Sequence, residues 1–300
     1  MKEQTHLKRY DMKEQTHLKR YDLHTHTQAS DGMQPPADNV RWAKEKGLAG
    51  VAITDHDTVA GLEEALEEGR RTGITVIPGV EISTRTSGKD IHILGYYMDY
   101  HNKEFLKRLE KLRQARDTRN DLILSRLRSL GVNITLEEVV ATMGRPLAPD
   151  ESIGRPHMAD TLVQKGYAKD MRDAFDRYLA EGAPGYVSVP RVEPAEAISW
   201  IREAGGVPVV AHPGLYGDDG LVRSIIEQAK PVGLEVRHSD HDDAAEKRYA
   251  AMAAHYGLIA TGGSDFHGAR QGVIFHGDLG SRSVNDQVVE DLRKAAAEQK

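Results

Sequence analysis

The sequence DLHTHTQASDG, residues 22–32, decides how the first strand of this protein is interpreted. Its two histidines, His24 and His26, are separated by one residue, and Asp31 follows five positions later. Residues i and i+2 of a β-strand point to the same face, so both imidazoles can reach one point in space where the strand ends. Gly32 then indicates that a loop opens. This pattern is typical of part of a metal site. One exposed histidine and one packed histidine would, however, have the same sequence pattern.

Short apolar strands and amphipathic helices alternate along the rest of the chain. We expect further strands, with the polar residues that follow them, at 50–58, 74–84, 91–99, 207–214, 232–236 and 258–268. We expect helices at 36–47, 59–72, 194–204, 221–229, 242–256 and 285–297. Such alternation is typical of a parallel α/β sheet or barrel, in which functional side chains gather at the carboxyl ends of the strands.

The middle of the chain has a different character. It is charged and lacks clear strand patterns, with one long helix expected at 103–130 and shorter ones at 134–143, 156–165 and 168–180. We therefore expect 101–190 to form a helical insertion that caps the α/β part, which would be built from 19–100 and 191–300.

The first 22 residues contain a perfect duplication. MKEQTHLKRYD occurs at 1–11 and again at 12–22, and nothing like it follows. Solenoid folds need several repeats, so this pattern does not indicate one. Only the second copy leads directly into LHTHT, and we expect 1–18 to be an N-terminal extension outside the core.

The composition excludes several classes of protein. There is no cysteine, so disulfides and thiolate metal sites are ruled out and any metal must use histidine and carboxylate. The net charge of -6 argues against a general nucleic-acid binder and against a stable long nucleic-acid partner, but not against a nucleotide substrate. No run of about 18 apolar residues and no apolar signal region occur, so we expect a cytoplasmic protein without membrane contact.

Histidines and carboxylates collect where the expected strands end. These residues are His24, His26, Asp31, Asp55, His56, Asp57, Glu81, His92, His212, Asp265 and His267. Each could also have an ordinary structural role, for example in a helix cap, as a packed histidine or in an Asx turn. Six of the fourteen histidines lie at such positions, however. One polynuclear metal site explains all of them together, whereas the alternative requires a separate structural role for each.

Taken together, the motifs HTH with its downstream aspartate, TDHD, PGVEIS, HILGY, AHPG and SDFH resemble those of the PHP (polymerase and histidinol phosphatase) superfamily. Within it, the chain is most similar to stand-alone phosphoesterases with a helical insert. The resemblance implies a distorted (β/α)7 barrel with a helical cap and up to three metals at its carboxyl face.

The resemblance also implies how the ligands are divided among the metals. A first metal would be held by His24, His26, Glu81 and Asp265. Glu81 would bridge to a second metal that also uses His92 and His212. A third would be held by Asp31, His56 and His267, which leaves Asp55 and Asp57 as supporting or capping residues.

Phosphoester hydrolysis suits such a centre. A hydroxide that bridges two cations would be the nucleophile, and a third cation could stabilise the leaving oxygen. Imidazole-rich ligand sets favour Mn, Fe or Zn over Mg, so we expect two or three divalent ions of those kinds.

The cap and the last strands supply candidate substrate contacts. Arg155 and His157, in the sequence GRPH, are expected to bind the substrate phosphate, although Arg155 could instead pair with a nearby surface carboxylate. His238 or His241 could approach the leaving group as general acid, or bind a second phosphate, or lie in a solvated loop.

We therefore predict a metal-dependent phosphoesterase that acts on a small phosphorylated substrate, foremost a nucleotide phosphomonoester. The alternatives are a 5′→3′ exoribonuclease on short RNA, a nucleoside 3′,5′-bisphosphate phosphatase, a histidinol-phosphate phosphatase and a non-catalytic metal-binding domain. The sequence leaves the metal identity and the oligomeric state open.

Overall fold

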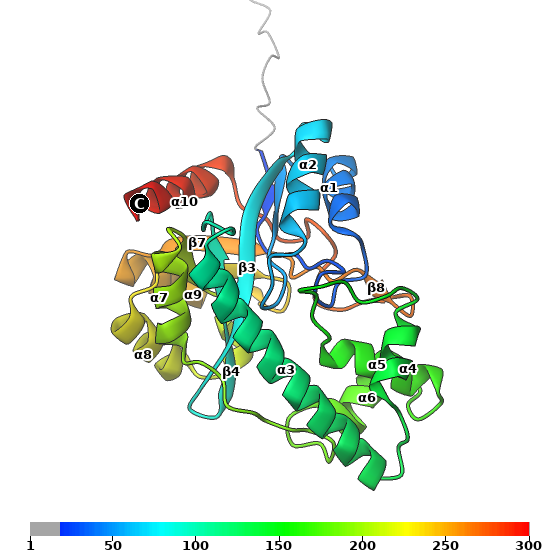
Figure 1. Ribbon diagram of the computed structural model, residues 1–300. Coiled ribbons are helices and arrows are strands. Elements are labelled where there is room, and N and C mark those ends of the chain that lie inside the picture. The colour runs from blue at the N-terminus through cyan, green and yellow to red at the C-terminus, as the bar shows by residue number, and fades with distance from the viewer. Residues whose placement is uncertain (1–18, 300) are drawn as a thin grey trace, which may run out of the picture.

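Seven strands form the sheet around which the molecule is built, in a computed structural model that describes residues 19–299 (Figure 1). Neighbouring strands in the sheet follow their order in the chain. The strands are β1 (Tyr21–Asp22), β2 (Gly50–Ile53), β3 (Thr75–Thr86), β4 (Lys89–Tyr96), β5 (Val207–Val210), β6 (Gly233–His238) and β7 (Ile259–Gly263).

The sheet is parallel except at one strand. β1, β2 and β3 are parallel to one another, as are β5, β6 and β7, but β4 is antiparallel to both β3 and β5. A tight turn at Ser87 and Gly88, with φ of 50° and 79°, joins β3 directly to β4. Two positive φ values are typical of the turn that closes an antiparallel hairpin. The expected parallel arrangement therefore does not extend to β4, because no helix lies between β3 and β4.

The last strand returns beside the first, so that the sheet is a nearly closed barrel. The Leu23 amide donates to the Gly262 carbonyl at 3.3 Å, and the His26 amide donates to the Phe266 carbonyl at 2.8 Å. A side chain at Gly263 would lie 2.3 Å from the His24 nitrogen, which explains the glycine at this close approach. The closure brings the segment after β7 against the segment after β1.

Helices cover the outside of the barrel. They are α1 (Pro36–Glu45), α2 (Leu62–Thr72), α7 (Pro194–Glu203), α8 (Asp219–Ala229), α9 (Asp243–Tyr256) and α10 (Asp286–Glu298), with a short 3-10 helix η2 (Pro213–Tyr216) after β5. In Figure 1, α1 and α2 lie on one side of β3, and α7, α8 and α9 lie on the other. Buried aliphatic side chains of the strands and of these helices form the main core.

A second group of helices separates β4 from β5 in the chain. It contains α3 (Lys103–Ser129), α4 (Leu136–Thr142), α5 (Arg155–Gln164), α6 (Met171–Ala174) and the π-helical turn η1 (Phe175–Leu179). Helix α3 begins where the Asn102 side chain accepts a hydrogen bond from the Phe105 amide at 3.0 Å. We refer to these helices as the cap, and they enclose an apolar cluster of their own.

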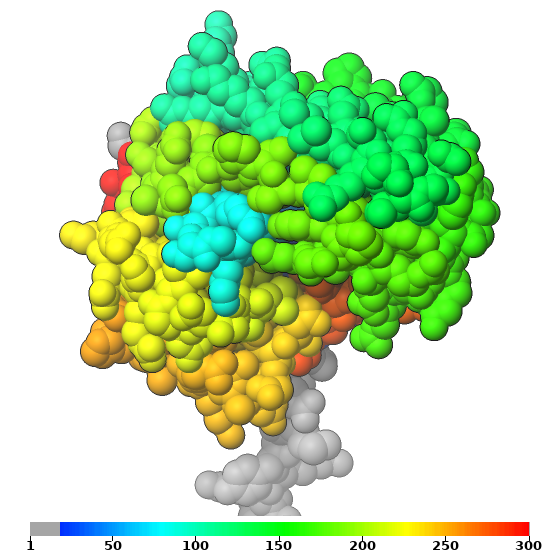
Figure 2. All heavy atoms as spheres, turned by 90° about the horizontal axis from the view of Figure 1, so that it is seen from below, coloured from blue at the N-terminus to red at the C-terminus, as the bar shows by residue number. Residues whose placement is uncertain are grey.

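The cap meets the barrel along α3 and at two hairpins. Figure 2 shows the tip of the β3–β4 hairpin (cyan) at the surface between the cap (green) and the C-terminal half (yellow). A second hairpin, β8 (Ala269–Arg270) with β9 (Val273–Ile274), was not anticipated. Its Arg270 contacts Asp160 of α5. The division of the chain at 100 and 190 stays a prediction, and the expected extension at 1–18 lies outside the described residues.

None of the helices in the described part of the chain is long and apolar enough to cross a membrane.

Candidate metal centre

Buried hydrogen bonds fix the loop that follows β1. Asp55 accepts hydrogen bonds from the Thr27 amide at 2.7 Å, from the Thr27 hydroxyl at 2.7 Å and from the Ser30 hydroxyl at 2.6 Å. These bonds use both carboxylate oxygens, and they hold the segment that ends at Asp31 against the end of β2. Asp55 is thus a supporting residue, as expected.

The first group of predicted ligands converges on one point. The Nε2 atoms of His24 and His26 lie 3.4 Å and 3.3 Å from Glu81 Oε2. The same two nitrogens lie 3.3 Å and 3.1 Å from Asp265 Oδ1. Atoms bound at about 2.0–2.2 Å to one tetrahedral cation lie about 3.4 Å apart, so these four atoms have the spacing of a ligand set.

Glu81 joins this group to a second one. Its other oxygen, Oε1, lies 2.8 Å from His92 Nδ1 and 3.0 Å from His212 Nε2. The carboxylate is almost fully buried, and its two oxygens face different imidazoles. This is the arrangement that a bridging carboxylate requires.

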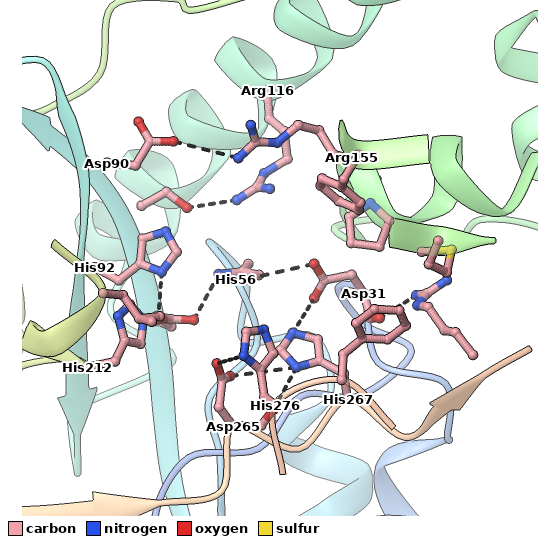
Figure 3. A pocket seen from close by; sticks show the side chains of 18 of the residues that line it. Asp31, His56, Asp90, His92, Arg116, Arg155, His212, Asp265, His267 and His276 are labelled. Atoms are coloured by element: carbon pink, nitrogen blue, oxygen red, sulfur yellow. Dashed lines mark hydrogen bonds and ion pairs between the residues drawn. The ribbon is translucent and has the colours of Figure 1, made fainter. Parts of the chain in front are cut away.

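A third group surrounds Asp31. Its Oδ1 lies 3.3 Å from His267 Nε2, and its Oδ2 lies 3.8 Å from His56 Nε2. His26, His56, His267 and Asp31 can together place four ligand atoms within 4.8 Å of one another. The structure thus brings together all nine residues predicted as metal ligands. Six of them are labelled in Figure 3: Asp31, His56, His92, His212, Asp265 and His267.

The hydrogen bonding of these residues is incomplete in the way that a cation site demands. Buried polar atoms without a hydrogen-bond partner are rare in folded proteins. Among the described residues, nine of the sixteen such side-chain atoms belong to the predicted ligands His24, His26, Asp31, His56, Glu81, His92, His212 and Asp265. Because the atoms are imidazole nitrogens and carboxylate oxygens, bound divalent cations would satisfy both kinds at once, and the residues present fit a metal centre.

The electrostatics of Glu81 and Asp265 agree with this interpretation. Burial alone would raise the pKa of each carboxyl group. Surrounding imidazoles outweigh burial and hold both pKa values well below their usual range. Both groups are therefore ionised and ready to neutralise cations.

Two of the predicted ligands also have uncommon backbone geometry. His212 has φ of 20° and Asp265 has φ of 55°. Positive φ is strained for residues other than glycine, and such strain is typical of functional sites.

A second layer of residues orients the predicted ligands. Glu235 is buried and lies 3.0 Å from His24 Nδ1, and it accepts a hydrogen bond from the His212 amide at 2.7 Å. A carboxylate on the far nitrogen of a metal-binding histidine fixes its tautomer and ring position. We did not anticipate Glu235, although a lone carboxylate within the apolar strand VGLEV was a usable signal.

His238 and His241, proposed as general acids, do not line the cavity above the predicted metal ligands. His241 Nε2 accepts from the Gly214 amide at 3.0 Å, and its Nδ1 donates to the Val236 carbonyl at 2.9 Å. Both ring nitrogens are thus occupied, and this role for His241 conflicts with the structure.

His238 is also occupied at both ring nitrogens. Its Nε2 lies 3.3 Å from Asp265 Oδ2, and its Nδ1 accepts from the Asp240 amide at 3.1 Å. The side chain is fully buried. His238 therefore positions Asp265 rather than contacting substrate.

His276, which the sequence did not single out, lines the cavity and lies 2.6 Å from Asp240 Oδ2.

A cavity of about 470 Å³ opens above the metal ligands. Arg155 lines it, and the side chain lies 3.7 Å from Asp90 Oδ2 and over the Tyr186 ring. The nearby carboxylates with which Arg155 could have paired are Asp150 and Glu151. They are bound instead by Arg113 and Arg145.

His157, the other predicted substrate contact, does not line this cavity. It is buried, and its Nδ1 accepts a hydrogen bond from the Gly154 amide at 3.0 Å at the start of α5. It borders a separate pocket of about 70 Å³. The structure thus gives it a capping role.

Comparisons with known proteins identify similar chains. A 3′,5′-nucleoside bisphosphate phosphatase from Chromobacterium violaceum is 35% identical over 256 residues, which cover 83% of this chain and 87% of that protein. The 5′-3′ exoribonuclease Rnm of Escherichia coli is 37% identical over 250 residues, covering 81% of this chain and 84% of that protein.

Solved structures show the same relationship. A crystal structure from Bifidobacterium adolescentis, assigned as a metal-dependent phosphoesterase, superposes with a TM-score of 0.82 at 32% identity, covering 92% of this chain and 96% of that one. The family model of the PHP domain matches residues 22–143. The chain therefore belongs to the PHP family, as its motifs predicted.

Proposed function

We propose that this metal-dependent phosphoesterase hydrolyses a small phosphorylated substrate of the nucleotide type. The observation that carries the proposal is the convergence of nine histidine and carboxylate side chains, most with an unpartnered buried atom, of which seven line one cavity and two, His24 and His26, lie buried beside them. Two of the relatives are named for acting on nucleoside bisphosphates and on RNA, which supports a nucleotide-type substrate here, and another is named for acting on a phosphoribosyl 1,2-cyclic phosphate.

The predicted ligand sets would hold two or three divalent cations. His24, His26, Glu81 and Asp265 would hold one, Glu81 with His92 and His212 a second, and Asp31 with His56 and His267 a third. When bound, such ions neutralise charge on phosphate oxygens and lower the pKa of coordinated water. The imidazole-rich sets favour Mn, Fe or Zn over Mg.

The remaining cavity walls suit a nucleotide. Arginines on the cap side offer forked donors for phosphate oxygens. Apolar side chains line the same space and offer a surface for a sugar or base, among them Met171, Phe175, Leu215 and Phe275. A cavity of about 470 Å³ fits a ligand of drug size, so it favours a mononucleotide or a chain end over long nucleic acid.

The other candidates are less well supported. A non-catalytic metal-binding domain is disfavoured because every ligand position of the family is filled in this chain. No feature of the cavity favours histidinol phosphate over a nucleotide.

A substrate screen tests the proposal. Purified protein loaded with manganese is assayed for release of phosphate from adenosine 3′-monophosphate, adenosine 5′-monophosphate, adenosine 3′,5′-bisphosphate and histidinol phosphate, and for release of phosphate or nucleoside monophosphate from a 5′-phosphorylated dinucleotide. We expect turnover of at least one nucleotide and its loss on chelation. Turnover of histidinol phosphate alone, or of nothing, contradicts the proposal.

A further inference from the structure

The strands that carry His92 and His212 separate at these two residues. β4 and β5 pair in register as far as Ile93, which lies opposite Val210. The same register places His92 opposite Ala211, and the Ala211 amide donates to the His92 carbonyl at 3.1 Å. His212 follows with φ of 20° and leaves the strand for the 3-10 turn η2. Both predicted ligands of the second cation therefore lie where the pairing of β4 and β5 ends.

The last hydrogen-bonded pair of these strands is incomplete. In an antiparallel sheet, the two residues of such a pair exchange both of their N–H···O bonds. His92 and Ala211, both in the described part of the chain, make only the bond from Ala211 to His92. The His92 amide donates instead to the Tyr216 hydroxyl at 3.1 Å, and that hydroxyl donates to the Ala211 carbonyl at 2.7 Å. The hydroxyl takes the place of the second bond and holds the two strands apart by the width of an oxygen atom.

Tyr216 is fixed in this position by its surroundings. It is the last residue of η2, four positions after His212, and the Leu215 amide closes the turn by donating to the His212 carbonyl at 3.0 Å. The Tyr216 side chain is buried, and its ring lies edge-on to the His212 ring with centroids 5.7 Å apart. Lys89 of β4 donates to the Tyr216 carbonyl at 2.5 Å. The hydroxyl therefore cannot shift without moving His212 or β4.

The spacing of the two strands matters because both imidazoles converge on one oxygen. His92 Nδ1 and His212 Nε2 lie 2.8 Å and 3.0 Å from Glu81 Oε1. The two rings are 5.1 Å apart and inclined by 75°. In Figure 3, both histidines lie on one side of the pocket, away from His267. A completed bond between His92 and Ala211 would draw the two backbones together and change this convergence.

Tyr216 can affect the site only through these ligands. Its neighbours His212 and Leu215 line the cavity, but Tyr216 does not. We infer that Tyr216 is a positioning residue, which sets the spacing of His92 and His212 and thereby the affinity of the second predicted cation site. This inference rests on the metal centre of the proposed function and identifies the feature that gives one of its sites its geometry.

Metal binding to the chelated protein tests this role without any substrate. Tyr216→Phe removes a single oxygen atom and lets the strands close or admit water. Because partners of metal ligands typically contribute about 10- to 100-fold to affinity, we expect the affinity for one manganese ion to fall by that factor in a calorimetric titration. The affinities for the remaining manganese ions should stay within about twofold of the wild type, since their ligands do not contact Tyr216.

The matched control is Tyr249→Phe. Tyr249 is also buried, but its hydroxyl donates to Asp219 at 2.8 Å and not to the backbone of a predicted ligand. Tyr249→Phe should leave every manganese affinity within about twofold of the wild type. If Tyr216→Phe weakened all ions equally, weakened none, or matched the control, the hydroxyl would serve the fold alone and the inference would be wrong.

A double-mutant cycle identifies the ion that is affected. His92→Gln removes a predicted ligand of the second site, whereas Asp31→Asn removes one of the third. Changes that act on the same ion are not additive. Tyr216→Phe should therefore have little further effect on manganese binding in His92→Gln but keep its full effect in Asp31→Asn. The reverse pattern would overturn the assignment to the second site.

Turnover separates a failure of this inference from a failure of the proposed function. With the best nucleotide, the manganese concentration for half-maximal activity should rise about 10- to 100-fold in Tyr216→Phe. At saturating manganese kcat should stay within about threefold, because the hydroxyl touches no substrate. A loss of kcat that manganese does not restore, or turnover with unchanged metal affinity, overturns the inference and leaves the proposed function intact. A selective loss of metal affinity in a protein that hydrolyses no phosphoester would keep the inference and contradict the proposed function.

Discussion

Seven of the nine predicted metal ligands line the same cavity as Arg116, Arg119, Arg155 and Arg191, which we refer to as the arginine wall, but the two groups satisfy their charges in opposite ways. Among the metal ligands, imidazoles and carboxylates alternate, and both kinds leave unpartnered atoms. In the arginine wall, cations outnumber the carboxylates beside them, and Arg119 has no carboxylate within reach among the described residues. The first pattern can be completed only by a cation and the second only by an anion, so together they indicate a substrate that bridges metal and arginine.

Removal of one predicted metal ligand should have the largest effect. Asp265→Asn takes away the charge of a carboxylate that lies 3.3 Å and 3.1 Å from the Nε2 atoms of His24 and His26. Cations contribute several kcal/mol of charge stabilisation to phosphoryl chemistry, so kcat/KM should fall by about a thousandfold. Steady-state kinetics with the best nucleotide, combined with metal analysis of the purified variant, measures both losses.

The matched control is Asp243→Asn, an exposed aspartate of α9. It should retain its metal content and its kcat/KM. If Asp265→Asn instead kept both, the predicted ligands would not be the metal centre.

Two arginines one turn apart on α3 sharpen the contrast within the wall. Arg116→Met breaks the buried contact with Asp57 and leaves that carboxylate unpaired. Such a loss typically costs about 3–5 kcal/mol in the free energy of unfolding. Arg119→Met leaves no carboxylate unpaired, so it should keep the free energy of unfolding within about 1 kcal/mol of the wild type, or raise it.

Urea unfolding of the purified proteins without substrate measures both values, and Arg128→Met, which removes an exposed arginine of the same helix, serves as the control. Equal destabilisation by Arg116→Met and Arg119→Met would mean that both arginines are structural. That result would remove the distinction between the partnered and unpartnered members of the wall.

Substitution of Glu235, which contacts the predicted ligand His24, should have a smaller effect on metal binding. Glu235→Gln keeps the shape of the side chain but removes the charge that faces His24 Nδ1. Changes in such outer partners typically cost about 10- to 100-fold in metal affinity. A competition titration with a metal-binding dye gives the dissociation constants, and an unchanged affinity would show that the His212 amide contact is the only role of Glu235.

The contrast between the predicted metal ligands and the arginine wall also explains what could be predicted from the sequence. The predicted metal ligands follow strands, where a two-residue spacing places side chains on one face and parallel strands end at one edge. Such features are local, and they were sufficient to bring His24, Glu81 and Asp265 into one predicted site. The barrel and the long helix α3 were predicted for the same reason.

The wall depends on tertiary packing instead. Helix α3 carries nine lysines and arginines, and nothing in their spacing marks Arg119 as the buried and unpartnered one. Its burial arises from the way the cap closes over β3 and β4. The antiparallel β4 was missed for a related reason, because its direction depends on a two-residue turn rather than on the strand pattern.

Substitution of His241 should have the smallest effect. This histidine was proposed from the sequence as a general acid, but its hydrogen bonds in the structure leave no ring nitrogen free for that role. A general acid contributes about 10²- to 10⁴-fold to a rate. His241 uses both ring nitrogens for hydrogen bonds to Gly214 and Val236, so His241→Gln should keep kcat within about twofold and lower the free energy of unfolding by about 1 kcal/mol. A pH profile of kcat identical to that of the wild type would confirm that His241 transfers no proton, whereas loss of the basic limb of that profile would restore it as the general acid.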